Sequence, residues 1–217
     1  MVGLGPTIVS VMVSSLAERA KPHENLDRLL KEIRACRICE AHLPHGVRPI
    51  IRASRTAGLC IVAQAPGIRV HETGLSFNDP SGDRLRAWLG IDRETFYDDS
   101  RIAVIGMGFC FPGYTASGAD KPPRPECAPT WQPRLAAALP PFALTLAVGT
   151  YAIDWHLGER RKSTMTETVR AWREYEPSLI PLPHPSWRNN AWLKKNPWFE
   201  SELLPDLRTR VRQALQP

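Results

Sequence analysis

Two short stretches decide the fold of this chain: IVAQAPG at residues 61–67 and PLPHPS at residues 181–186. Each begins as an apolar run typical of a buried strand and ends in a turn marked by glycine or proline. Each turn also carries a polar side chain, Gln64 in the first and His184 in the second. We therefore expect both turns to lie at the same edge of one sheet and to face one cleft.

Further apolar runs and helical patterns alternate along the rest of the chain. Runs rich in β-forming residues predict strands within 58–64, 101–108, 142–149 and 178–184. Apolar residues at helical spacing predict helices at 23–36, 79–90, the second half of 129–140, 150–158, 166–175 and 197–215, the last one broken or kinked at Pro205. This alternation predicts a single α/β domain with a central, mainly parallel four-stranded sheet flanked by helices. Such sheets bind ligands beyond the carboxyl ends of their strands.

The bulk properties are those of an ordinary globular domain. The chain has 217 residues, of which 43% are hydrophobic and 23% charged, and its net charge is +6. This charge agrees with nucleic-acid binding without requiring it. No run of 18 apolar residues occurs, so no membrane span is expected. Residues 1–21 are expected to be a leader or a frayed segment before a domain at 22–217, and the protein is expected to be a monomer.

The five cysteines do not form the pattern of a secreted disulfide scaffold, so a cytoplasmic protein is expected. Cys60 lies inside the first predicted strand and should be a small buried apolar residue. Cys36 and Cys39 form a C-x2-C pair, which together with Cys110 and Cys127 can ligate one centre. By ligand count, four thiolates fit zinc and a [4Fe–4S] cluster equally well. The alternative is a redox C-x-x-C pair with two incidental cysteines.

The motifs around these cysteines resemble those of the uracil-DNA glycosylase superfamily, most closely its iron–sulfur branch in bacteria and archaea, called family 4. That branch has C-x2-C, then a strand ending in GE[AG]PG, then ED-x-x-G-x-PF-x-G-x-AG, and finally HP[SA]. The stretch AQAPGIRVHETGLSFNDPSG follows this frame over 63–82, and HPS follows at 184–186. The residues in register are Pro66, Gly67, Gly74, Phe77 and Gly82. The resemblance covers about residues 30–215 and implies a [4Fe–4S] cluster on the four cysteines, with zinc as the alternative.

The resemblance also implies an activity. It predicts a monofunctional DNA glycosylase of base-excision repair that flips uracil out of DNA and hydrolyses its N-glycosidic bond. Three departures weaken the match to uracil: Gln64 replaces a Glu, Val70 and His71 replace the acidic pair, and Gly106 stands where family 4 has the Asn that reads uracil. Two alternatives therefore stay open. The enzyme could act on another deaminated base, hypoxanthine or xanthine, or the protein could be a non-catalytic metal-containing protein that binds nucleic acid.

Catalytic roles follow from the same motifs. His184 is expected to donate a hydrogen bond to the leaving base, and Gln64 to meet the base through its backbone or amide. His71 or Glu72 is expected to align the attacking water, with Asp79 as a further candidate. Three of these residues have a structural alternative. His184 could be held by turn carbonyls, His71 could be a surface loop residue, and Asp79 could be only a helix cap.

Base and DNA contacts complete the predicted site. Phe77 should stack on the flipped base. The other base-binding candidates are Ala65, Met107 and Asn189. The segment after the HPS motif should insert into the duplex or grip phosphates, through Ser186, Trp187, Arg188 and Lys194. The alternative is a surface loop anchored by its tryptophan.

Overall fold

The computed structural model describes residues 24–216. Within them, four parallel strands form one sheet in the order β2-β1-β3-β4. The strands are β1 (Leu59–Ala63), β2 (Ile102–Gly106), β3 (Leu144–Val148) and β4 (Leu179–Leu182). The predicted single α/β domain with a parallel four-stranded sheet is confirmed. The predicted leader at 1–21 lies outside the described residues.

The strands are apolar because helices cover both faces of the sheet. All the residues of β4 are buried, and each of the other strands has one partly buried residue: Ala63 in β1, Gly106 in β2 and Thr145 in β3. Cys60, 2% exposed within β1, is the buried apolar residue that the sequence predicted. Pro181 fits in β4 because β4 pairs only with β3 and so has a free edge.

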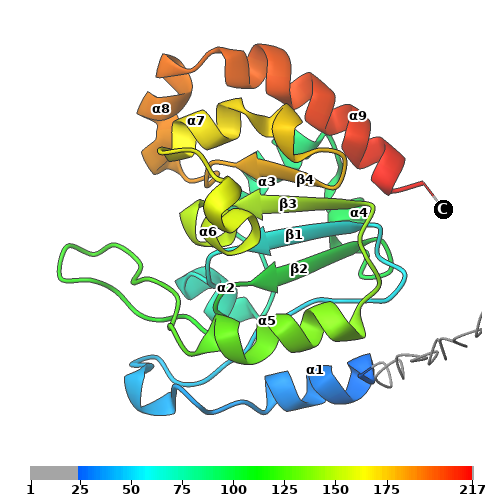
Figure 1. Ribbon diagram of the computed structural model, residues 1–217. Helices are drawn as coiled ribbons and strands as arrows, with labels where there is room; N and C mark the ends of the chain where they lie inside the picture. The colour runs from blue at the N-terminus through cyan, green and yellow to red at the C-terminus, as the bar shows by residue number, and fades with distance from the viewer. Residues whose placement is uncertain (1–23, 217) are drawn as a thin grey trace, which may run out of the picture.

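Helices surround the sheet (Figure 1). The α-helices are α1 (Leu26–Arg34), α2 (Ile68–Thr73), α3 (Pro80–Leu89), α4 (Arg93–Tyr97), α5 (Cys127–Ala138), α6 (Thr150–Leu157), α7 (Met165–Arg170), α8 (Asn190–Lys195) and α9 (Leu204–Ala214). Figure 1 shows α1 beside α5 at the β2 side of the sheet, and α7, α8 and α9 at the β4 side. None of the helices within 24–216 combines the length and the apolar character needed to cross a membrane.

Most predicted helices are present, with differences that have physical causes. Short helices α2, α4 and α8 carry too few apolar residues for a periodic pattern. Helix α5 is helical from Cys127 onward and not only in its second half, because Pro129 occupies the first turn, where no backbone donor is required. The predicted break at Pro205 is a π-helical turn at Phe199–Leu203 that leads into α9.

The carboxyl ends of all four strands lie on one side of the molecule. Figure 1 shows the strand arrows ending at the side from which the loop of residues 111–126 projects. This loop lies between β2 and α5 and ends just before Cys127, the first residue of α5. The fold thus brings the β1 and β4 turns and this loop to a single edge.

Candidate active site

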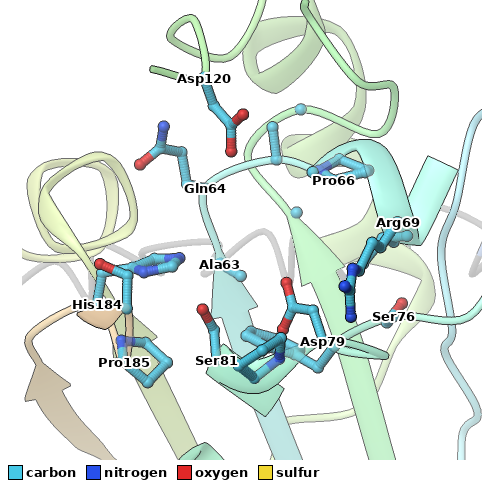
Figure 2. A pocket seen from close by; sticks show the side chains of 18 of the residues that line it. Ala63, Gln64, Pro66, Arg69, Ser76, Asp79, Ser81, Asp120, His184 and Pro185 are labelled. Atoms are coloured by element: carbon cyan, nitrogen blue, oxygen red, sulfur yellow. The ribbon is translucent and has the colours of Figure 1, made fainter. Parts of the chain in front are cut away.

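A cleft of about 620 Å³ lies at the carboxyl edge of the sheet. Its walls come from the turn after β1, the turn after β4, the end of β2, the segment 76–84 and the loop 111–126. Figure 2 shows Gln64 and His184, from the first and last strand ends, around this space. The two turns therefore face one cleft, as the sequence predicted.

The cleft gathers most of the predicted site residues, but not all. Those that line it are Gln64, Ala65, Phe77, His184, Ser186, Trp187, Arg188 and Asn189. Four others are not among its lining residues: His71, Glu72, Met107 and Lys194. Met107 lines a neighbouring groove, and Lys194 is exposed in the last turn of α8.

His71 and Glu72 belong to a separate packing arrangement. The Nε2 atom of His71 lies 3.0 Å from the carbonyl oxygen of His45, and its ring lies 6.1 Å from that of Phe111. The guanidinium of Arg48 donates hydrogen bonds to the carbonyl oxygens of both His71 and Glu72. These contacts hold the end of α2 against the start of the loop 111–126.

His184 is partly buried and lies just beyond the end of β4. Burial lowers the pKa of His184, Arg188 lowers it further, and the carboxylates of Asp79 and Asp120 oppose the shift. The side-chain amide of Asn189 donates a hydrogen bond of 2.6 Å to the carbonyl oxygen of His184. A Cβ built on Gly149, after β3, would lie 3.6 Å from the Cβ of His184. The ring is therefore neutral near neutral pH, and the backbone of His184 is held by Asn189 and lies close to Gly149.

Phe77 has an unusual backbone conformation. Its φ is +56°, a left-handed value that costs a bulky side chain energy and is often found at functional sites. Its carbonyl oxygen accepts hydrogen bonds from Tyr97 and Arg86, both at 3.3 Å. A Cβ on Gly82 would lie 1.8 Å from this oxygen, so only glycine fits at position 82. These contacts hold the Phe77 ring in the cleft wall, where it packs edge-to-face on Phe96 at 6.0 Å.

The structure explains why the last residue of β2, Gly106, has no side chain. A Cβ on Gly106 would lie 2.4 Å from the carbonyl oxygen of Gly108. The backbone there is fixed, because the amide N of Met107 donates to the Ala63 carbonyl and that of Gly108 to the Gln64 carbonyl. An asparagine at position 106 therefore requires the backbone to move.

Two carboxylates enter the cleft. Figure 2 shows Asp120, from the loop 111–126, and Asp79, before α3, pointing toward the space beside His184. Asp79 caps α3 by accepting a 2.8 Å hydrogen bond from the backbone of Gly82. Loss of hydration raises the pKa of Asp120, Asp79 raises it further, and Arg188 and His184 oppose the shift. Sequence reasoning missed Asp120, since nothing in the local sequence indicates that the loop folds back over the cleft.

Positive charge and aromatic surface surround the mouth of the cleft. Arg69, Arg84 and Lys121 line it together with Arg188. The guanidinium of Arg84 donates to the carbonyl oxygen of Ser186 at 3.0 Å and so braces the turn after β4. Trp187 is 72% exposed, with the Arg188 guanidinium 5.6 Å from its ring centre. This rim suits a polyanion that carries aromatic bases.

The four cysteines outside β1 lie together. Cys36, Cys39, Cys110 and Cys127 line one small cavity, and all are free thiols. Burial raises the pKa of Cys110 to about 11 and that of Cys127 to about 12. Among the described residues, no group of three or more His, Cys, Asp or Glu side chains is arranged to hold a single metal ion. The cavity brings together four soft donors from the end of α1, the end of β2 and the start of α5.

In a parallel α/β sheet the carboxyl edge is the usual place for a ligand, and the basic, aromatic rim of this cleft suits a nucleotide or a base. The family model described as the uracil DNA glycosylase superfamily matches residues 52–208, and the chain belongs to this superfamily. Membership makes the protein a DNA glycosylase, a hydrolase of DNA repair with DNA as its substrate. The predicted superfamily is confirmed, while the iron–sulfur branch stays a prediction.

Proposed function

We propose that the protein is a monofunctional glycosylase that flips uracil out of DNA and hydrolyses its N-glycosidic bond. The observation that carries the proposal is the pairing, in one cleft, of an aromatic ring held in a strained conformation with a partly buried, neutral histidine. The ring of Phe77 stacks on the extruded base and keeps water from that face. The neutral His184 has an N–H to donate to the base.

Bond cleavage leaves negative charge on the departing base. A donor aimed at the developing charge lowers the barrier more than one that binds the ground state equally well. In our proposal His184 donates to a base oxygen, and Gln64 meets the base edge from the end of β1. Asn189 acts on His184 through its bond to the His184 carbonyl, so its role is to position the histidine.

The attacking water requires a proton acceptor near the sugar. Asp79 and Asp120 line the cleft, whereas His71 and Glu72 are not among its lining residues. We therefore assign water alignment to the two aspartates. The water oxygen bonds to the anomeric carbon of the sugar as the bond to the base breaks. A proton of this water passes to a carboxylate, and Asp120 is the better acceptor because its pKa is raised.

A second candidate substrate is xanthine. Gly106 offers no side-chain amide to read uracil, and ionised carboxylates only accept hydrogen bonds. The cleft therefore favours a base edge with N–H donors. As nucleosides, uracil and hypoxanthine each present one ring N–H, whereas xanthine presents two.

We propose that the rim binds the DNA backbone. Trp187 fills the gap left by the extruded nucleotide, because its indole is exposed beside the cleft. Arg188 contacts phosphates close to that nucleotide. Ser186 holds the turn in place, and Lys194 adds charge farther along α8.

We also propose a [4Fe–4S] cluster on Cys36, Cys39, Cys110 and Cys127. Four thiols around a shared cavity suit a cluster, each of whose irons takes one protein sulfur. Zinc, which draws all its ligands to one point, is the alternative. Either the cluster or zinc, when bound, would cross-link the segments that carry the four cysteines. The cysteines would then tie α1 to both ends of the loop 111–126, which carries Asp120.

The test is direct. The protein is incubated with oligonucleotides that carry uracil, hypoxanthine or xanthine, and alkali-labile abasic sites are counted under single-turnover conditions. Release of uracil supports the first candidate and release of xanthine the second. Tight binding with no abasic sites for any base would instead favour a protein that binds DNA without cleaving it. His156→Ala is a matched control for His184→Ala, because burial lowers the pKa of His156 too, yet it lies on α6 and does not line the cleft.

A further inference from the structure

A second open groove lies beside the cleft. Its volume is about 840 Å³, and it is bounded by residues 41–44, Met107, the segment 121–125, the start of α5 and helix α6. That volume is in the range of sites that hold small ligands. The chemistry assigned to the cleft makes no use of it.

An aromatic pair forms one side of this groove. Tyr151 and Trp155 both line it, and each is 42% exposed. They are four positions apart on α6, so their side chains share one face of the helix. Single exposed aromatic residues are common, but two on one face of a groove provide a stacking surface for flat rings.

The opposite walls are rigid and apolar. Six prolines line the groove: Pro44, Pro112, Pro122, Pro123, Pro125 and Pro129. Proline has no backbone N–H and a fixed φ, so these walls change little on binding and offer few polar groups. A rigid apolar groove loses little entropy when it orders an aromatic ligand.

The charge of the groove favours an anion. None of its fifteen lining residues is acidic, and Lys121, Arg124 and His42 are basic. Arg124 is already paired with Glu126, so Lys121 is the main site for a phosphate. A ligand with flat apolar rings on an anionic backbone fits this combination.

The groove adjoins the cleft. Pro112 and Lys121 line both of them, and Met107 in the groove directly follows Gly106 in the cleft. A strand whose target nucleotide lies in the cleft can therefore continue into the groove along the surface.

We propose that this groove binds unpaired nucleotides that flank the target nucleotide on one side. Their bases stack on Tyr151 and Trp155, and a phosphate contacts Lys121. The proposal rests on the proposed function only in that the target nucleotide occupies the cleft. It predicts that the enzyme acts best where DNA is single-stranded on that side.

The first experiment measures binding and requires no excision. Fluorescence anisotropy compares undamaged single strands and duplexes for wild type, Tyr151→Ala, Trp155→Ala and Trp155→Phe. We expect each alanine variant to bind the single strand about 10-fold more weakly, at the lower end of the range for losing one stacked base. Trp155→Phe should retain most of the affinity, and duplex binding should stay within about 2-fold. Thermal melting confirms that the variants are folded.

The second experiment locates the groove along the strand. Substrates carry the target nucleotide in a duplex with an unpaired flank on its 5′ side, its 3′ side or neither. Wild type should excise faster from one flanked substrate at sub-saturating enzyme, and the double variant Tyr151→Ala/Trp155→Ala should lose this advantage while keeping its rate on the full duplex. Alanine variants that bind single strands as wild type does would overturn the groove assignment. If wild type excises nothing but single-strand binding still requires both aromatics, the proposed function fails and the groove stands.

Discussion

The sharpest test of the base pocket is Phe77→Leu. Leucine keeps most of the side-chain volume and has the same left-handed backbone strain, so the comparison isolates the aromatic face. Loss of one base–aromatic stack costs about 1–3 kcal/mol. At about 1.4 kcal/mol per tenfold, single-turnover excision should fall by about 5- to 150-fold.

The same substitution also affects stability, and a second variant separates the two effects. Phe77 is 9% exposed and packs edge-to-face on Phe96, so Phe77→Leu should cost about 0.5–1.5 kcal/mol for this pair. Phe96→Leu breaks the same ring pair, but Phe96 is not among the residues that line the cleft. It should lower the melting temperature while leaving excision within about 2-fold of wild type. A folded Phe77→Leu protein that excises at the wild-type rate would show that the base does not lie against this ring.

Three further predictions concern the chemistry and the cysteines. His184→Ala should lower single-turnover excision by about 10²-fold or more, the scale for one positioned donor, while His156→Ala leaves it unchanged; equal rates for both variants would remove His184 from the mechanism. Asp120→Asn should lower excision by about 10²-fold and abolish the acidic limb of the pH–rate profile. The reason is that an ionised acceptor is lost as pH falls through its pKa, and the pKa of Asp120 is raised. If the acidic limb is unchanged in this variant, another group is responsible for it. Anaerobically purified protein should contain iron and absorb broadly near 400 nm. Cys110→Ser should lose the iron, whereas Cys60→Ala should retain it. Stoichiometric zinc without iron would show a single-ion site in place of the proposed cluster, and the absence of any metal would exclude both.

The sheet was predictable because parallel strands buried on both faces are continuous apolar runs. The turn residues Gln64 and His184 followed from the same logic, since strand ends meet at one edge. The positions of His71 and Asp120 were not predictable in this way. Whether a side chain in a turn or loop reaches the cleft depends on tertiary contacts, such as the bond from His71 to His45. Those contacts leave no periodic signal in the sequence.

The end of β2 links the cleft to the cysteine cavity and explains why position 106 has no side chain. Gly108 lines both spaces, and the backbone there is paired to β1 through Gln64. This close approach excludes a side chain at Gly106, so position 106 offers the base only backbone groups. On the same stretch of chain, Asp120 lines the cleft and is carried by the loop between Cys110 and Cys127. In our proposal, a group bound to these cysteines would hold both ends of the loop that carries Asp120, and would thereby influence excision without contacting the base.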